Sequence, residues 1–560
     1  MFIKTTTSKG RDYVKLVESY RDENKISRHK VLYNFGRLDL IRDNKSFLIA
    51  LKKLCELVNI EVYEDRTEKY SQAQILDYGY LPYAILWETL GIGNCLRGIK
   101  KNATCSFSLS ESSFLMVIQH LLAPKSKLAT CENQEKYFGL AKIQLHQLYR
   151  TLDKLAKHKE KIEDMLFYEN YTKVNSKVDV VFYDVTTFAF ESVIADELKS
   201  RGFSKDCKFN EVQVVMGLLI DAFGLPIGYE LFSGNTFDGK TMVKALENIK
   251  KRFGIQRVII VADRGLNSKS NLLHIKEAGY GYIVASKIKS MSISQQEKIL
   301  DDTGFVVVSE DFKYKSIDYV NTFKDEEKKL HQLEEKLIIT YCGKRAKKDA
   351  ADREKLLEKA QNLLAQPSGI AQSNKRGGKK FIKEINHTET KYCLNQELIE
   401  KDKRFDGFYG IQTSEKTMSA TDIMDAYHTL WKIEESFRIM KSTLEIRPIF
   451  HWTPERIRGH FLICFLSFML ERRLEFILRE NNIEFSPERI RAALCGMQLV
   501  KFNVNDETVY IKTKMEGLAL HICKLLNIKL PDNINTHNQL CDIFAKSIPK
   551  KDLWGQLLLF

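Results

Sequence analysis

The sequence lacks the cysteine spacing of zinc motifs and disulfide scaffolds. Its 11 cysteines are scattered along 560 residues, with no Cys-x2-Cys pair and no companion histidine spacing. This distribution argues against a cysteine-based zinc motif and is typical of buried thiols in a reducing compartment.

Long apolar segments are also missing. The most apolar run, Phe461 to Leu470, has ten residues, whereas a membrane-spanning helix needs about 20. The N-terminal residues MFIKTTTSKGRDYVK contain no apolar signal segment. The sequence shows neither an internal repeat nor a low-complexity linker. We therefore expect a soluble, cytoplasmic protein without a membrane partner.

Positive charge is present in excess. Lys and Arg number 87 against 73 Asp and Glu, which gives a formal net charge of +14. Such an excess favours a polyanionic partner, chiefly nucleic acid. With 44% hydrophobic residues, the chain is long enough for a large core and about two to four domains.

The hydrophobic pattern changes along the chain. Apolar and polar residues alternate over residues 1–40, which predicts a three-stranded meander, and residues 44–170 have helical periodicity. A strand-rich block over 178–233 precedes a helix–strand–helix–strand alternation to about residue 287. This order predicts an α/β fold (multidomain α+β) with a mixed sheet and crossover helices.

The alternation is interrupted between residues 290 and 420. This segment contains a charged helix, KRAKKDAADREKLLEKAQNLL, and a basic run interrupted by glycines. The run contains Lys375, Arg376, Lys379, Lys380 and Lys383. It has two interpretations, a solvated loop or a set of phosphate contacts in a basic protein.

Two aspartates occupy strand positions that the pattern assigns to apolar side chains. Asp184 follows Val180 and Phe182 on one face of VDVVFYDVTTF, and Asp263 ends the apolar strand RVIIVAD, where sheet enzymes build their sites. A buried carboxylate needs a cationic partner, helix amides or a metal ion. The simpler alternatives are a turn or edge position for Asp184, and a helix cap or an ion pair with Arg264 for Asp263.

A glutamate interrupts the apolar stripe of the helix predicted over Ala426 to Pro448. Tyr427, Glu434 and Lys441 are seven residues apart and line up on one face of such a helix. The simpler alternative is an exposed ion pair between Glu434 and Arg438. Together with the two aspartates, an inward-facing Glu434 would supply the hard oxygen ligands that two Mg²⁺ ions require.

The three acidic motifs together resemble the DDE transposases of bacterial insertion sequences. These motifs are YDVTTFAFES around Asp184, VIIVADRGL around Asp263 and YHTLWKIEESFRIMK around Glu434. The resemblance is to the group with a Tyr-x2-Arg-x3-Glu-x6-Lys signature. Three of its four positions match, and Leu430 replaces the arginine. The contact of that arginine must come from another residue, with Lys432 or Arg438 as candidates.

The resemblance implies a ribonuclease H-like core split by an insertion domain. It divides the chain into five parts: a β-meander and helical DNA-binding region (1–170), the first part of the core (171–290), the insertion domain (291–420), the last part of the core with the glutamate helix (421–480), and a C-terminal helical region (481–560).

The resemblance also implies the chemistry. Asp184, Asp263 and Glu434 would bind two Mg²⁺ ions, with Mn²⁺ as an alternative, and catalyse cleavage at element ends and strand transfer. The DNA contacts would come from Tyr427, Lys441, Arg438, Lys375, Arg376, Lys379 and Lys380. The partners would be terminal inverted repeats and target DNA, bound by a homodimer in a synaptic complex at the bacterial nucleoid.

Two other classes of protein fit the same residues. A ribonuclease H-like, metal-dependent nuclease would cleave DNA without strand joining, and a domesticated transposase would bind DNA without catalysis. Two further side chains receive structural roles. We expect Trp431 in the core rather than stacked on a base, and His460, a lone histidine at the start of an apolar helix, outside the metal site.

Overall fold

The computed structural model describes most of the chain, in two compact units. The described residues are 1–42, 44–58, 73–101, 106–173, 180–190, 194–202, 211–235, 252–253, 258–262, 267–324, 328–365, 377–386, 391–446, 449–504 and 507–548. One unit comprises Met1–Gln74 and Phe502–Thr508, and the other comprises the rest of the chain. The first boundary falls inside the region predicted as 1–170, and the five-part division stays a prediction.

The N-terminal unit begins with the meander that the alternation predicts. Strands β1 (Phe2–Ser8), β2 (Arg11–Arg21) and β3 (Ser27–Arg37) form an antiparallel sheet in that order. Lys9 and Gly10 join β1 to β2 with φ of 50° and 72°, the two positive values of a type I′ hairpin turn. Helices α1 (Leu38–Arg42) and α2 (Lys45–Leu57) follow.

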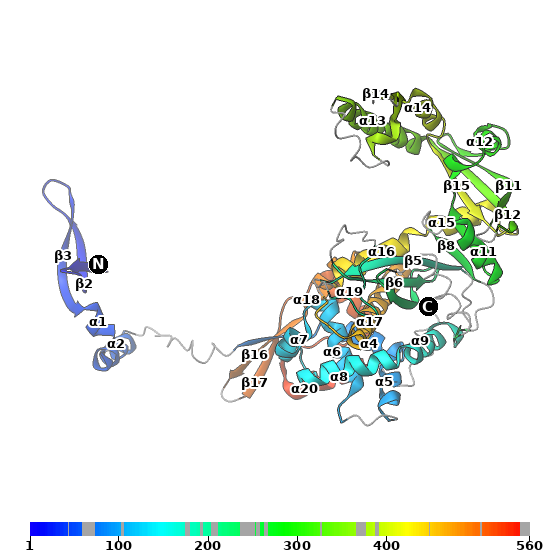
Figure 1. Ribbon diagram of the computed structural model, residues 1–560. Coiled ribbons are helices and arrows are strands. Elements are labelled where there is room, and N and C mark those ends of the chain that lie inside the picture. The colour runs from blue at the N-terminus through cyan, green and yellow to red at the C-terminus, as the bar shows by residue number, and fades with distance from the viewer. Residues whose placement is uncertain are drawn as a thin grey trace. The chain divides into compact units, whose positions relative to one another are not determined.

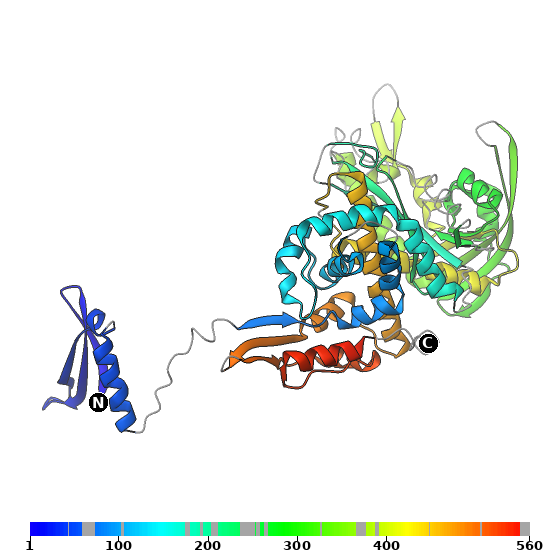
Figure 2. The same cartoon turned by 90° about the horizontal axis from the view of Figure 1, so that it is seen from below.

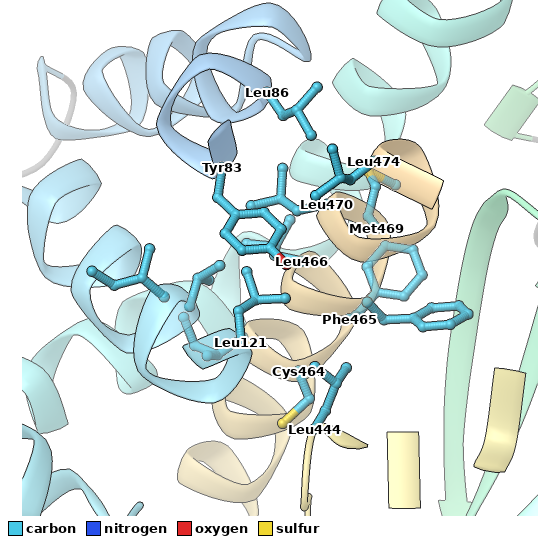
Figure 3. Packing of buried hydrophobic residues seen from close by; sticks show 14 of the residues in the cluster. Tyr83, Leu86, Leu121, Leu444, Cys464, Phe465, Leu466, Met469, Leu470 and Leu474 are labelled. Atoms are coloured by element: carbon cyan, nitrogen blue, oxygen red, sulfur yellow. The ribbon is translucent and has the colours of Figure 1, made fainter. Parts of the chain in front are cut away.

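The core of the second unit forms around α17 (Pro454–Glu480), which is buried along most of its length. Figure 2 shows it in orange among the blue and cyan helices, and Figure 3 shows apolar side chains packed around Leu466. The surrounding helices are α4 (Leu81–Thr89), α5 (Ile92–Lys101), α6 (Leu109–Leu122), α7 (Lys127–Asn133), α8 (Leu145–Lys157) and α9 (Lys159–Phe167). Within the described residues, no helix is long and apolar enough to cross a membrane.

One glycine sets the close approach of α17 to α8. A Cβ added at Gly459 would lie 2.2 Å from the carbonyl oxygen of Leu152. Real Cβ atoms do not come this close to backbone, so a larger residue would push the two helices apart.

The central sheet has the strand order of a ribonuclease H-like core. Strands β5 (Val180–Ala189), β6 (Gln213–Ile220) and β7 (Pro226–Ser233) form an antiparallel meander, and β8 (Ile259–Ala262) and β9 (Gly281–Ala285) continue it in parallel with β5. The spatial order is β7-β6-β5-β8-β9. This arrangement confirms the predicted α/β fold class and the mixed sheet.

Helices cover both faces of this sheet. Val181, Tyr183 and Val185 of β5 pack with Leu272 of the crossover helix α11 (Lys269–Glu277). Phe182 and Phe188 point the other way and join the large core of the second unit. Helices α15 (Ala420–His428), α16 (Trp431–Arg438) and α17 cover this second face, and α16 packs on β5 and β6 (Figure 1).

The segment after β9 extends the same sheet. Strands β15 (Phe408–Thr413), β12 (Leu330–Cys342), β11 (Phe312–Lys324) and β10 (Val306–Ser309) follow β9 outward, all antiparallel, and β10 forms the edge. The register shifts between Val307 and Ser309. The remaining elements of this segment are α12 (Ile293–Leu300), α13 (Gly343–Ala365), β13 (Ile382–Asn386), β14 (Lys391–Leu394) and α14 (Gln396–Lys403).

The C-terminal region is helical, with a small sheet. Helix α18 (Pro487–Cys495) begins at Pro487, because Ser486 caps the amide of Arg489 and Pro487 occupies the first turn. Helices α19 (Gly517–Leu525) and α20 (His537–Ser547) follow. The sheet has the order β18-β17-β16-β4, formed by β18 (Ile534–Thr536), β17 (Glu507–Lys512), β16 (Gln498–Val504) and β4 (Gln74–Asp77).

Candidate active site

Asp184 lies in the middle of the first core strand. It is half-buried, whereas Tyr183 and Val185 beside it are fully buried, and its backbone pairs with Leu218 of β6. Its Oδ1 accepts a hydrogen bond of 2.8 Å from the amide of Val185. Strand alternation puts Asp184 on the face of Phe182. The carboxylate therefore lies on the side of the sheet that α16 covers.

Asp263, the second predicted ligand, lies outside the described residues, as does Arg264. The strand that leads to it is described. β8 pairs with β5 in parallel register, Val180 opposite Ile259 and Phe182 opposite Val261. The role of Asp263 and its simpler alternatives stay predictions.

The segment expected to form one helix over Ala426 to Pro448 is interrupted twice. Helix α15 ends at His428, α16 begins at Trp431, and residues Ile439–Thr443 form a π-helix. The hydroxyl of Thr429 donates to the carbonyl of Asp425, 2.8 Å away, a side-chain bond that competes with regular helix. The single-helix prediction was wrong because these breaks change the helical phase.

The breaks change which side chains of α16 face the core. Ile433 and Phe437 are buried against the sheet side, whereas Glu434 is exposed. Trp431 has 52% of its surface exposed, so its prediction as a core residue was wrong. The expectation of an inward-facing Glu434 was therefore wrong: the residue is exposed, on a helix that packs on the strand of Asp184.

Two cationic side chains fix α16 against the β6–β7 turn. Lys432 donates a hydrogen bond of 2.8 Å to the carbonyl of Ala222, and partial burial lowers the pKa of its ammonium. Arg472 of α17 donates to the carbonyl of Gly224 at 3.3 Å and to Glu435 at 3.0 Å. The turn, α16 and α17 are therefore joined through polar contacts.

Arg472 also pairs with an acid on its own helix. Its guanidinium lies 2.6 Å from Glu475 and has a side-chain exposure of 1%. Burial raises the pKa of Glu475, and the positive charge of Arg472 opposes that rise. Sequence analysis missed this network; its signal was the charged triplet ERR within the apolar stretch of α17.

The residues of the signature have different surroundings. Tyr427 is half-buried, and its hydroxyl forms a hydrogen bond of 2.6 Å with the hydroxyl of Tyr409 on β15. Lys441 is half-buried, with its ammonium 5.7 Å from the ring centroid of Phe188 on β5. Leu430, at the arginine position, is buried. An apolar side chain that packs in the hydrophobic core therefore occupies the position of the signature arginine.

Arg438 is the exposed cation at the end of α16. Its side chain is 73% exposed and lies 3.7 Å from Glu435, three residues before it. The expected alternative pair of Arg438 with Glu434 is thus replaced by a weak surface pair with Glu435. The guanidinium is accessible to a phosphate.

The basic run falls partly outside the described residues, which begin again after Lys375 and Arg376. Lys380, in the short helix Gly378–Phe381, forms an ion pair of 2.9 Å with Asp402. Asp402 also pairs with Lys289, at 2.9 Å. Lys380 therefore already has an internal anion, while Lys379 is half-buried in the same turn.

The donor chemistry of the site suits a hard divalent ion. Asp184 and Glu434 offer carboxylate oxygens, which Mg²⁺ and Mn²⁺ prefer over nitrogen or sulfur. Asp184 is half-buried within a buried strand, and a carboxylate in such a position needs a cation as its partner.

The strand order, with a carboxylate on its first strand, defines a ribonuclease H-like protein. Residues 176–470 match the family model of the transposase DDE domain, and residues 3–61 match the N-terminal domain of IS1634 family transposases. The first match spans more than half of the chain, so the chain belongs to the DDE transposases of bacterial insertion sequences. It functions in DNA transposition, binds DNA and is an enzyme that depends on a divalent metal ion.

No curated protein matches the sequence. Among solved structures, the chain is similar to piggyBac transposase in a synaptic complex with hairpin DNA, with a TM-score of 0.34 and 8% sequence identity over 85% of this chain and 86% of that chain.

Proposed function

We propose that Asp184, Asp263 and Glu434 form the catalytic triad of this transposase and bind two Mg²⁺ ions, which Mn²⁺ can replace. The observation that carries this proposal is the parallel register of β5 and β8. Phe182 pairs with Val261, and in the sequence each predicted aspartate follows two residues later. Because parallel strands run in the same direction, this register favours two neighbouring carboxylates on one face.

Glu434 is the third member because α16 packs on the strand of Asp184. The contacts of Lys432 and Arg472 with the β6–β7 turn hold α16 on the sheet, and the exposed Glu434 remains accessible to a ligand. Bound metal ions would activate a water or a DNA 3′-hydroxyl and stabilise the leaving oxygen of an in-line displacement. The chain itself would supply the acidic side chains that hold these ions.

DNA would be held by the cations around this site. Arg438 is accessible at the end of α16, and Lys441 lies above Phe188 on β5; these positions support contacts of both residues with phosphates near the cut. Tyr427 and the run of Lys375, Arg376, Lys379 and Lys380 are further proposed contacts. For Lys380, a phosphate must compete with Asp402.

The assembly follows from the reaction. Joining both ends of an element requires two active sites, so we propose a homodimer that binds terminal inverted repeats and target DNA at the bacterial nucleoid in the cytoplasm. Residues 1–170 would recognise the element ends, and residues 481–560 would contribute to the dimer.

The test is a cleavage assay with a duplex that carries the DNA flanking the gene. Glu434→Gln is expected to abolish Mg²⁺-dependent cleavage and strand joining, because it removes one ligand charge while keeping the side-chain shape. DNA binding, measured by fluorescence anisotropy, should stay within about twofold, since phosphate contacts supply most of the affinity.

The matched control is Glu480→Gln, an exposed acid at the end of α17, which should cleave like the unchanged protein. Full cleavage by Glu434→Gln would exclude the proposed triad. Cleavage without joining in the unchanged protein would identify a nuclease, and binding without cleavage would identify a domesticated DNA-binding protein.

A further inference from the structure

A second group of potential metal ligands lies inside the core, between α6 and α17. His120, His460 and Cys464 are all buried, and one ligand atom from each lies within 4.8 Å of the other two. His460 and Cys464 are four residues apart on α17, so both face α6. The sulfur of Cys464 is 3.7 Å from Nε2 and 4.0 Å from Nδ1 of His460. The set is nitrogen and sulfur, unlike the carboxylates of the active site.

Backbone carbonyls fix the tautomer of both imidazoles. Nδ1 of His120 lies 3.1 Å from the carbonyl of Leu444, and Nε2 of His460 lies 3.3 Å from the carbonyl of Ile446. A carbonyl only accepts, so each of these nitrogens carries the proton. Nε2 of His120 and Nδ1 of His460 therefore keep their lone pairs. A histidine that donates one N–H to a carbonyl and offers the other nitrogen is the usual arrangement at protein metal sites.

A third imidazole lies beside this group. The ring of His451 lies 5.1 Å from that of His460, which in turn lies 5.3 Å from that of His120, all between centroids. Tetrahedral coordination with Zn–N bonds of about 2.0–2.1 Å separates imidazole centroids by about 5 Å. The spacing of each of these two pairs is thus close to that of two histidines that bind one ion. Burial lowers the pKa of all three rings, which keeps them neutral.

A cation lies beside one of these ligands. Nζ of Lys127 lies 3.1 Å from Nε2 of His120, and in the described part of the chain it has no carboxylate partner. Lys127 lines a cavity of about 500 Å³ together with His451 and Tyr149. This cavity offers both an entry path and room for the lysine to move.

We propose that His120, His460 and Cys464, with His451 as the fourth ligand, form a second metal site that binds Zn²⁺ in place of the Lys127 ammonium. Histidine nitrogen and cysteine thiolate are zinc ligands, and Mg²⁺ does not compete for them. On binding, Cys464 releases its proton to solvent and binds as the thiolate. The ion would fix Leu444 and Ile446, the segment just after the π-helix of Lys441.

The test uses the full chain, stripped of metal, with Co²⁺ as the probe. One equivalent should produce a thiolate-to-cobalt charge-transfer band and the visible bands of tetrahedral cobalt, and excess Mg²⁺ should not remove them. Cys464→Ser should lose the charge-transfer band, and Cys541→Ser should keep it. Cys541 is the matched control because its sulfur lies 3.5 Å from Nε2 of His537, four residues before it on α20.

Further variants separate this site from its alternatives. His120→Asn should bind Co²⁺ about tenfold or more weakly, and Lys127→Met should bind it more tightly, because a competing positive charge is removed. Asp184→Asn should keep the band, so failure of the proposed triad does not affect this result.

X-ray absorption of the unchanged chain loaded with Zn²⁺ gives an answer that needs no variant. Three nitrogen ligands at about 2.0–2.1 Å and one sulfur at about 2.3 Å are expected. A shell of oxygen alone, or a charge-transfer band that disappears in Cys541→Ser instead, would overturn the proposal.

Discussion

Arg472 is a fully buried guanidinium that connects three parts of the core. It binds Glu475 on its own helix, Glu435 on α16 and the carbonyl of Gly224 in the β6–β7 turn. A buried ion pair adds little net stability, but removal of one partner leaves an uncompensated charge. The residue therefore determines how α16 lies on the sheet.

Replacement of Arg472 by methionine is expected to lower the free energy of unfolding by about 3–5 kcal/mol, because Glu475 and Glu435 lose their buried partner. Chemical denaturation measures this loss. Arg479→Met is the control: Arg479 lies 3.6 Å from Glu475 and is 31% exposed, so its loss should be below about 1 kcal/mol. Equal losses in the two variants would contradict the special role of Arg472.

Glu471 gives the fold a pH dependence. Burial, with a smaller contribution from Glu475, raises the pKa of its carboxyl to about 8, and its Oε2 lies 2.6 Å from the hydroxyl of Tyr83. Above the unfolded pKa of about 4.3, the folded state binds more protons than the unfolded state. The stability that Glu471 contributes is therefore fully present below the unfolded pKa and is lost as the pH rises towards the folded pKa of about 8.

Glu471→Gln removes this titration. Relative to the unchanged chain, the variant should gain more than about 1 kcal/mol of stability between pH 5 and pH 8, measured by urea unfolding at both pH values. The exposed Glu480→Gln should show no such gain. A difference between Glu471→Gln and the unchanged chain that does not vary with pH would show that Glu471 stays ionised in the folded state.

At the scale of elements, strand alternation was the strongest guide. It predicted β5 to β9, because each strand combines a run of β-branched and aromatic residues with a turn. The helix–strand alternation that follows predicted the crossover helix α11. The first helix of the alternation predicted after residue 233, over residues 238–254, lies almost wholly outside the described residues. Helical periodicity was a weaker guide around Glu434, because it does not register a π-turn or the competing hydroxyl of Thr429.

The crossing of α17 and α8 is expected to tolerate no side chain at Gly459. Gly459→Ala should lower the free energy of unfolding by about 1–3 kcal/mol, since its Cβ would lie 2.2 Å from the carbonyl of Leu152. Gly98→Ala in α5 is the matched control, with no atom within 4 Å of its added Cβ. It should be neutral or stabilising by about 0.4–1 kcal/mol. Thermal and urea unfolding of both variants decide this.

At the scale of the whole molecule, the sequence predicted the transposase family and the mixed sheet, but not how the parts share that sheet. The segment after β9 was predicted as an insertion domain, which stays a prediction, and its strands β15, β12, β11 and β10 continue the central sheet. Pairing between strands distant in sequence leaves no local signal. The contact of His120 with His460 and Cys464 leaves no local signal either, because these two residues come more than 300 residues later.

Strand β10 forms an edge of the central sheet, where a strand from another molecule could add. Val306, Val307 and Val308 are all more than half exposed, a composition that invites strand addition from another molecule. The strand has only four residues, and its register shifts after Val307. Because β10 is short and its pairing is irregular, its free backbone N–H and C=O groups are poorly aligned for pairing with an incoming strand. These two features of β10 disfavour the addition of a strand from a second copy at this edge of the sheet.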